Sequence, residues 1–488
     1  MSTPGGLLGQ LRKLGTQSAV YGTADVFQRI VSMLLLPLYT SYLTPVDYRD
    51  LALLLTLTAV AKILFRLGLD AGFFRVHYDR DAAGQRRLAG SIALFSGLYA
   101  AVLLGAIAWA REPLATALLG ERPSRWVVLA AADVALTSLA FVPMNLLRIQ
   151  DRPGYFSVLS GFRHALTILS KVVLVTAGFG VDGVLWADVF GTTAFTMSLL
   201  PVLWRNADFR PDLSGLRAAL AFGIPKTPHG FMVQVQNLAD RKLLDFYVPP
   251  AVVGLYQLAS TIGESVKFAL SAFEPAWQPF VYSEQRRADA PRTLARVATF
   301  AWLAFVTAGL GVAVLGRELL RLLTTPGFHG GAPVIPVIVL AFLLHGVFLL
   351  TSIGIGIRKR TGYYPLISAA AAATNVGVNL AVIPHFGMMG AAWATVASYA
   401  VMAGLGFRIG QRLYPMPLEL GRLGRITLAG LLIFALAQVS PDALWPAVVF
   451  KSAVLLVFPA LLWLSGFLRP DERARILRAI EGIRTRKR

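Results

Sequence analysis

The dominant pattern of the chain is a succession of apolar runs between residues 18 and 467. Each run is about 20 residues long, enough for a helix to cross the hydrocarbon core of a bilayer. Gly, Pro and clusters of charged residues separate the runs, and no gap is long enough for a soluble domain. The pattern predicts an all-α integral membrane protein with about 14 transmembrane helices. In the first half we place them at 18–43, 51–70, 88–110, 126–147, 155–177 and 183–204. In the second half we place them at 224–247, 251–273, 297–316, 333–357, 362–384, 387–407, 426–440 and 446–467.

Composition agrees with a membrane protein and restricts the chemistry. The 488 residues are 56% hydrophobic and 15% charged, and the mean hydropathy is +0.62. Cysteine is absent, which excludes disulfides, thiolate metal sites and cysteine nucleophiles. The six histidines are too scattered to suggest a zinc centre. We therefore expect no metal and no cofactor.

One stretch, "GFGVDGVLWAD" at 178–188, contains the glycine spacing of a dinucleotide-binding loop at Gly178, Gly180 and Gly183. That spacing indicates a nucleotide site only after a strand in a βαβ unit. Here it lies between two apolar runs, and "HFGMMGAAWAT" at 385–395 repeats it without the first glycine. We therefore interpret these residues as turn glycines.

The two glycine stretches belong to an internal duplication. "GYFSVLS" (154–160) matches "GYYPLIS" (362–368), and "YLTP" (42–45) matches "YVPP" (247–250), at nearly constant offsets. Each match is displaced by six spans, so the two copies share one orientation and are related by an axis along the membrane normal. This predicts an N-terminal lobe at 1–204 and a C-terminal lobe at 205–410, each with six helices. Two further helices at 411–467 and a basic amphipathic tail at 468–488 complete the predicted organisation.

The basic residues predict the topology. Most of the 46 Lys and Arg residues fall at the N-terminus, in the even-numbered loops and at the C-terminus, the segments that the positive-inside rule assigns to the cytoplasm. We expect a multi-pass protein of the inner or plasma membrane with both termini cytoplasmic. The net charge of +20 is then mainly a topology signal, and nucleic acid is not an expected partner. The tail places Ile476, Ile480 and Ile483 on one helical face, which suits the leaflet surface, although an ordinary positive-inside signal explains the same arginines.

Charged residues inside the apolar runs are the candidate functional groups, because a charge in hydrocarbon needs a wet cavity, a partner or access to the interface. The candidates for binding an anionic substrate are Arg29, Lys62, Arg163, Lys171 and Lys267. Some can be neutralised locally, since Asp25 precedes Arg29 by four residues and Glu264 precedes Lys267 by three. Lys62, Arg163 and Lys171 have no obvious local partner. Polar candidates for ion or sugar contacts are Asp25, Asp240, Asn237, Asn375 and Asn379, and Asp188 is a further ion candidate.

Several segments in this order resemble the polysaccharide flippase (Wzx-like) branch of the multidrug/oligosaccharidyl-lipid/polysaccharide (MOP) exporter superfamily. They include "SMLLLPLYTSYLTPVDYRDLAL", "LGLDAGFFRVHYDRD", "LLRIQDRPGYFSVLS" and "RKRTGYYPLISAAAAATNVGVNLAVI". The resemblance implies two six-helix lobes that alternate between inward-open and outward-open forms. It also implies a substrate, an undecaprenyl-pyrophosphate-linked glycan carried to the outer leaflet, with a glycan polymerase or export machinery and membrane lipids as partners. Arg29 and Lys62 lie where related lipid II flippases carry basic residues, but the flanking sequences differ. The last two spans hold only Lys451, near an outer end, which favours a different lipid-linked sugar.

Two other functions remain open from the sequence. A multidrug or cation antiporter of the same fold would call for an acidic cavity, whereas the span residues are largely basic. A membrane-embedded glycosyltransferase or polymerase is suggested only by the D-x-D triplet Asp79–Asp81, which lies in a short basic loop. We therefore expect a transporter rather than an enzyme.

The topology makes a direct prediction. Reporters fused after Arg87, after Arg210 and at the C-terminus should read cytoplasmic, because basic loops are retained on that side. A reporter fused after Glu121 should read external. Paired phosphatase and fluorescent-protein fusions measure this, and cytoplasmic accessibility at Glu121 contradicts the fourteen-span arrangement.

Overall fold

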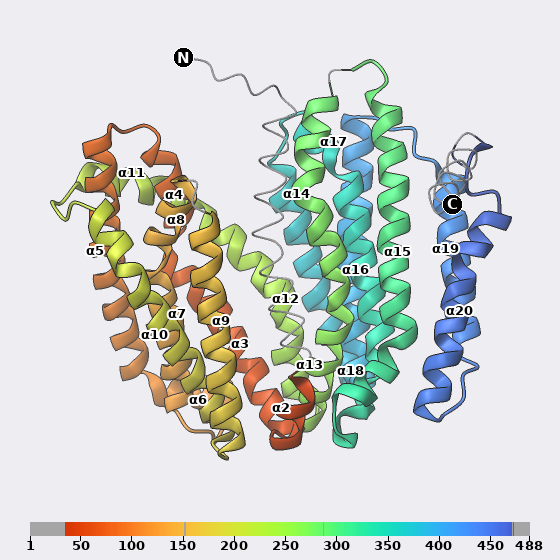
Figure 1. The fold of residues 1–488 in the computed structure, drawn as a ribbon, viewed down its shortest axis with the longest axis horizontal. Helices are drawn as coiled ribbons and strands as arrows, with labels where there is room; N and C mark the ends of the chain where they lie inside the picture. Colours follow the sequence, from red (N-terminus) through yellow and green to blue (C-terminus); the bar gives the residue numbers. More distant parts are fainter. Residues whose placement is uncertain (1–34, 151–152, 286, 471, 473–488) are drawn as a thin grey trace, which may run out of the picture. The chain divides into compact units, whose positions relative to one another are not determined.

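A computed structural model describes residues 35–150, 153–285, 287–470 and 472, and within these ranges the chain is built from helices without strands (Figure 1). The first helices are α2 (Leu36–Tyr42), α3 (Pro45–Arg66), α4 (Leu69–His77), α5 (Ala82–Trp109), α6 (Arg111–Leu119), α7 (Arg125–Leu139), α8 (Phe141–Ile149), α9 (Pro153–Thr176), α10 (Gly180–Asn206) and α11 (Leu213–Gly223). They are followed by α12 (Thr227–Tyr247), α13 (Pro250–Gly263), α14 (Lys267–Glu284), α15 (Ala290–Leu323), α16 (Val334–Thr351), α17 (Ile353–Ile357), α18 (Tyr363–Leu413), α19 (Leu420–Ala437) and α20 (Leu444–Leu464).

The predicted membrane helices from 51–70 onward correspond to these elements, the first, at 18–43, lies mostly outside the described residues, and the all-α membrane fold is confirmed. In the described part of the chain, nine helices are long and apolar enough to cross a bilayer. One of them, α18, contains two predicted spans, because Gly387 has non-helical angles (φ 52°, ψ −129°) that break it. Two helices outside this set, α3 and α12, also match predicted spans but carry several charged side chains.

Two of the three predicted turn glycines, Gly178 and Gly180, form a turn, whereas Gly183 lies inside α10 and its prediction as a turn glycine is wrong. Gly178 and Gly180 adopt φ values of 89° and 54° between α9 and α10, a region that side chains with a Cβ rarely enter. Gly387, the counterpart of Gly180 in the second copy, has φ 52°. The matched prolines also agree, because Pro45 begins α3 and Pro250 begins α13. The two copies thus share local structure at two matched places.

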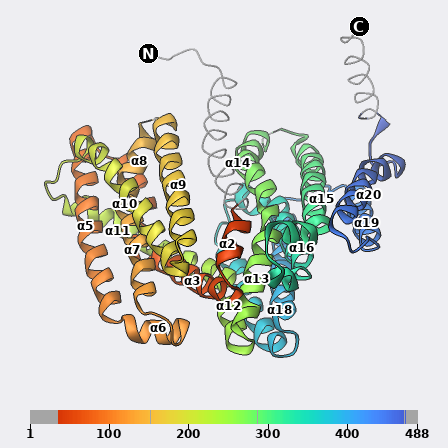
Figure 2. The same ribbon diagram turned by 60° about the horizontal axis from the view of Figure 1, so that its bottom comes forward.

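Short helices and one helix extension were not predicted. Helices α4, α6 and α11 lie in segments that the hydrophobic pattern treats as loops. Figure 2 shows α6 lying crosswise between the end of α5 and the start of α7. A short 3-10 turn at Glu264–Val266 joins α13 to α14, so the helical segment continues to Glu284, beyond the predicted end at 273. Length alone could not reveal these features, because short amphipathic helices leave no span-sized run.

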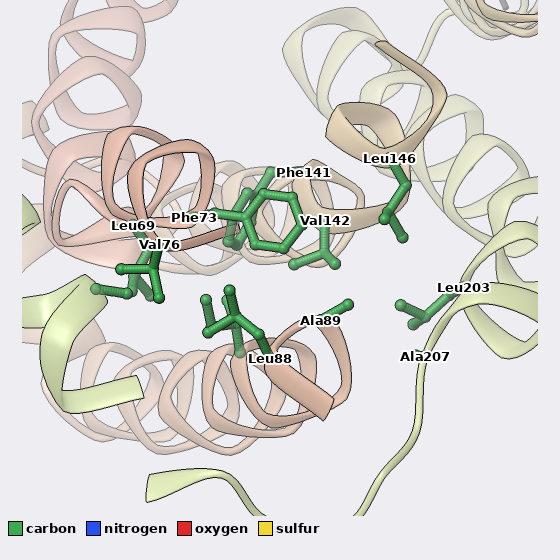
Figure 3. Packing of buried hydrophobic residues seen from close by; sticks show 12 residues of the cluster. Leu69, Phe73, Val76, Leu88, Ala89, Phe141, Val142, Leu146, Leu203 and Ala207 are labelled. Atoms are coloured by element: carbon green, nitrogen blue, oxygen red, sulfur yellow. The ribbon is translucent and has the colours of Figure 1, made fainter. Parts of the chain in front are cut away.

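The chain divides into two compact units. The first contains the chain up to Leu258 together with Leu323–Gly331 and Ser368–Ala394. One of its hydrophobic clusters joins α4, α5, α8 and the end of α10, with Phe73, Leu88 and Phe141 at its centre (Figure 3). This packing fixes the helices that flank the polar residues described below. The predicted lobes at 1–204 and 205–410 describe the duplication and stay a prediction.

The second unit contains Ala259–Leu322, Ala332–Ile367 and the chain from Thr395 onward. In it, α15, α19 and α20 pack through an apolar cluster that includes Leu310, Ile433 and Phe458. Beside this cluster, Lys451 of α20 places Nζ 2.8 Å from each carboxylate oxygen of Glu318 in α15, and both side chains are buried. Although Lys451 lies near an outer end of its predicted span, its side chain does not extend to the interface. Its ammonium group finds a carboxylate inside the protein instead.

The opposite end of the same helices is held by Glu472, which receives ion pairs from Arg296 of α15 and Arg422 of α19. Glu472 follows α20 and lies outside the spans. Burial raises the pKa of its carboxyl, but the backbone N–H of Arg469 and the guanidinium of Arg296 outweigh burial and hold the pKa below its ordinary value. The carboxylate therefore stays ionised and fastens α15 to the last two helices.

The buried Lys451–Glu318 pair yields a stability prediction. Lys451→Met should lower the free energy of unfolding by about 3–5 kcal/mol, because Glu318 is left as an uncompensated buried charge. The double variant Lys451→Met, Glu318→Leu should recover most of the loss. Unfolding of purified protein in detergent measures both, with Arg317→Gln, whose partner Asp442 is exposed, as a control that changes little. Equal losses in the single and double variants contradict a charge-based explanation.

Candidate functional site: a polar cluster among the first helices

The centre of the candidate site is a chain of three side chains from α7, α9 and α10 in the first unit. Nη2 of Arg163 donates to the hydroxyl of Thr192 at 2.9 Å, and that hydroxyl donates to Oδ1 of Asp133 at 2.5 Å. Because a hydroxyl has one proton, donating it to Asp133 leaves a lone pair directed at Arg163. The guanidinium also lies over the ring of Phe195, 5.2 Å from its centroid. The sequence predicts that Arg163 is a mid-span cation without a local partner. In the structure it is linked to Asp133, which is far from it in the sequence.

The candidate residues predicted from the sequence do not include Asp133. The signal was present, because Asp133 is the only charged residue in the apolar stretch "WVVLAAADVALTSL" at 126–139. A lone carboxylate at that depth is a functional hypothesis in its own right. What the sequence could not show is that α7, α9 and α10 bring it to Arg163 through Thr192.

Lys171 also has a partner that the sequence did not indicate. Its Nζ lies 2.8 Å from Oδ1 of Asp188, which projects from the neighbouring helix α10. The predicted lack of a local partner was correct only within α9. The pair is close to Asp133, since Lys171 and Asp188 both act electrostatically on that carboxylate.

Lys62 completes the group. Its side chain is exposed on α3, and no ion pair involves it among the described residues. The charges that act on it are Arg66, Asp70, Arg163 and Asp133. Arg66 is engaged by Asp70, with 3.1 Å between nitrogen and oxygen. We define the polar cluster as Lys62, Arg66, Asp70, Asp133, Arg163, Lys171, Asp188 and Thr192; it is mixed in charge with a small cationic excess rather than wholly basic.

Three predicted residues cannot be placed in this cluster. Asp25 and Arg29 lie outside the described residues. Asn237 lies in α12, but its side chain is also outside the described set. Their proposed roles stay predictions.

In the second unit, Lys267 is neutralised locally, in the way its spacing suggested. Its Nζ lies 2.7 Å from Oε2 of Glu264 and 4.3 Å from the centroid of the Phe342 ring. The structure therefore gives Lys267 a carboxylate and an aromatic face within its own unit.

The predicted polar candidates Asn375 and Asn379 form a buried pair in the first half of α18. Nδ2 of Asn379 donates to Oδ1 of Asn375 at 3.1 Å, and neither side chain is exposed. Nδ2 of Asn375 and Oδ1 of Asn379 have no hydrogen-bond partner among the described residues. Buried amide groups of this kind are costly unless something satisfies them.

Asp240 of α12 lies at a comparable depth. A Cβ on Gly387 would meet Val248 at 3.5 Å, so the ends of α12 and of the first half of α18 are adjacent. Asp240 and Asn379 each precede this meeting point by eight residues, or about 12 Å of helix. Asp240 is 6% exposed and accepts a hydrogen bond of 2.5 Å from Tyr256. The predicted polar residues of the second copy thus gather at one level.

A second ion network joins α3 to α12 near the matched turns. Nε and Nη2 of Arg49 donate to the two oxygens of Asp245 at 2.5 and 2.8 Å, and Nη1 donates to Asp50 at 2.7 Å. Arg122 also pairs with Asp50, at 2.9 Å. The backbones are close here, since a Cβ on Gly254 would lie 1.8 Å from the carbonyl oxygen of Pro45. We call Arg49, Asp50, Arg122 and Asp245 the α3–α12 latch.

Taken together, helices that cross a membrane and enclose compensated charges define a multi-pass membrane transporter fold, and comparison with known proteins agrees. The family model described as polysaccharide biosynthesis protein matches residues 14–279, more than half of the chain, and the chain belongs to that family. A curated relative, the probable flippase AglR of Haloferax volcanii, is 24% identical over 275 residues. That match covers 54% of this chain and 56% of the relative, so it spans little more than half of each.

Solved structures show the same fold at low identity. The lipid II flippase MurJ in an inward closed conformation superposes with a TM-score of 0.74 at 12% identity, covering 91% of this chain and 99% of that one. An inward-facing multidrug resistance MATE family transporter of the MOP superfamily gives 0.61 at 16% identity, covering 82% and 96%. These likenesses show that the chain shares the fold of these transporters.

Proposed function

We propose that this protein is a flippase that moves an undecaprenyl-pyrophosphate-linked oligosaccharide, or a related anionic lipid-linked glycan, from the cytoplasmic to the outer leaflet by alternating access. The family supports a role in polysaccharide biosynthesis, and two of the similar proteins are described as flippases. The observation that carries the proposal is the polar cluster, where Lys62 and Arg163 present cations inside apolar helices. Transport changes no covalent bond, so the protein is not an enzyme.

The chemistry of the two cations suits a pyrophosphate. An Arg guanidinium can bind two phosphoryl oxygens at once, while a Lys ammonium supplies a mobile point charge. Nη2 of Arg163 donates to two neutral hydroxyls, that of Thr192 at 2.9 Å and that of Thr137 at 3.4 Å. These contacts satisfy the guanidinium without neutralising it, so an anion gains more by binding Arg163 than by binding Lys171, which already has Asp188.

The rival functions lose support. A cation antiporter has the same fold, and the carboxylates of the polar cluster are compatible with it, but the family match favours polysaccharide export. A glycosyltransferase or polymerase rested on Asp79 and Asp81. Asp79 forms an exposed ion pair with Arg75, and Asp81 caps the start of α5 through the N–H of Gly84. Both carboxylates therefore have structural roles in their loop.

The buried amides and Asp240 are our candidates for binding the coupling ion. Asn375, Asn379 and Asp240 offer amide and carboxylate oxygens, which suit a hard monovalent cation or, at Asp240, a proton. Such an ion would satisfy the unpartnered Oδ1 of Asn379. Asp188 is engaged by Lys171, which makes it a weaker candidate.

The cellular setting follows from the same proposal. The protein is a multi-pass membrane protein; we place it in the inner or plasma membrane with both termini cytoplasmic. The partners are membrane lipids, the lipid-linked glycan and a glycan polymerase or export machinery on the outer face. With this topology, the α3–α12 latch lies near the outer surface, and we propose that it opens during release of the substrate.

A transport assay tests the function. In liposomes with controlled protein orientation, a pyrophosphate-linked glycolipid should cross faster when the cytoplasmic-equivalent side is negative. An anion moving outward then gains about 2.3 kcal/mol per charge per 100 mV. Neutralising Lys62 and Arg163 together should slow translocation. Accessibility of the headgroup to an impermeant reagent, under a potassium-diffusion potential, measures the rate; export of cationic dyes without glycolipid movement overturns the assignment.

The latch gives a second prediction. Because the chain has no cysteine, Arg49→Cys and Asp245→Cys introduce the only thiols. Joining them with a reducible bis-maleimide should stop translocation, and reduction should restore the rate seen before cross-linking. Each single variant treated with the same reagent is the control. Continued translocation by fully cross-linked protein shows that α3 and α12 need not separate.

A further inference from the structure

Arg163 poses an electrostatic problem that the substrate alone does not solve. A carrier that releases an anion must return empty, and a cation left uncompensated among apolar helices is costly. The substrate phosphate compensates Arg163 only while it is bound. A resident anion of the protein must therefore compensate the charge of Arg163 while the empty carrier returns.

We propose that Asp133, acting through Thr192, is the resident counter-anion of Arg163 and is displaced from it by the substrate phosphate. This inference rests on the proposed function. It makes Asp133 a positioning residue that sets both affinity and turnover, because it competes with the substrate for the same guanidinium.

The geometry carries this assignment. Thr192 is 1% exposed, so its hydroxyl is held between Asp133 and Arg163 and excluded from the surroundings. Asp133 makes no direct ion pair with Arg163 in the structure; the hydroxyl separates them. The contact between the two charges is consequently easy to exchange, unlike the direct pair of Lys171 with Asp188.

The relay also explains how Arg163 stays in place when its partner changes. The Phe195 ring supports the guanidinium face, and Thr192 remains bonded to Asp133 whichever anion Arg163 faces. In the loaded state phosphoryl oxygens replace the threonine hydroxyl as acceptors. In the empty state Arg163 returns to the hydroxyl.

Because of this competition, removing the resident anion should lower both the half-saturating substrate concentration and the maximal transport rate. Removing the resident anion should tighten binding, because the substrate no longer competes with it, and should slow release and return. A residue with a merely structural role would lower the amount of active protein and leave the half-saturating concentration unchanged. The two parameters therefore separate the explanations.

The experiment uses the full chain in liposomes, with undecaprenyl-pyrophosphoryl N-acetylglucosamine as the probe at varied mole fraction. Asp133→Asn should lower the half-saturating mole fraction by about five- to tenfold, a typical coupling between two ligands of one group, and should lower the maximal rate by a similar factor. Thr192→Val should reproduce this split, whereas Thr192→Ser, which keeps the hydroxyl, should behave as wild type. Asp182→Asn removes a carboxylate of the same helix α10 that pairs with Arg125 at an exposed end, and it should change neither parameter.

The outcomes separate this inference from the function on which it rests. An active wild type in which Asp133→Asn raises the half-saturating mole fraction, or leaves it unchanged, overturns the counter-anion assignment alone. A wild type that does not move the probe overturns the proposed function and this inference together. If Asp133→Asn does not accumulate in the membrane, Thr192→Val and Thr192→Ser are compared instead. The assignment is overturned if both variants have the half-saturating mole fraction and maximal rate of the wild type.

Discussion

Hydrocarbon does not solvate ions, and this constraint organises every polar feature of the molecule. Most charges that enter the described apolar helices are met by an opposite charge or a polar group from the same or a neighbouring helix, and Lys62 is the exception discussed below. The direct pairs are Arg66–Asp70, Lys171–Asp188, Lys267–Glu264 and Lys451–Glu318. Helix packing and charge compensation are therefore one problem here, since a helix that shifts away leaves a charge exposed to lipid.

These charged groups differ in whether an opposite charge contacts them directly. We use this difference to distinguish structural ion pairs from the proposed substrate site. Lys451 and Glu318 are buried and directly bonded, so an external ligand would have to pay the full cost of parting them. Arg163 faces Asp133 only through a hydroxyl, and Lys62 has no ion pair among the described side chains. Our proposal places substrate binding where compensation is indirect, because such contacts can be exchanged for a ligand.

The duplication supplies a shared scaffold with different chemistry in each copy. The turn at Gly180 recurs at Gly387 with nearly the same φ, yet Asp188 of the first copy corresponds to Thr395 in the second. The helices of both copies carry charged side chains, but the buried amide pair of Asn375 and Asn379 lies in the second copy. The copies thus share a turn and differ in their polar side chains.

Much of the fold was determined by the sequence alone, because a membrane helix is defined by a local property, the length of an apolar run. The length of the apolar runs identifies the spans. Other local patterns identify the turn at Gly178 and Gly180, the repeat, and the pair of Lys267 with Glu264 three residues away. Tertiary structure alone decided which distant charges meet. The pairing of Lys171 with Asp188, the burial of Lys451 against Glu318 and the link from Arg163 to Asp133 depend on which helix faces which. Helical periodicity gives the face of a residue on its own helix, but the neighbour of that face is set by packing between helices far apart in the chain.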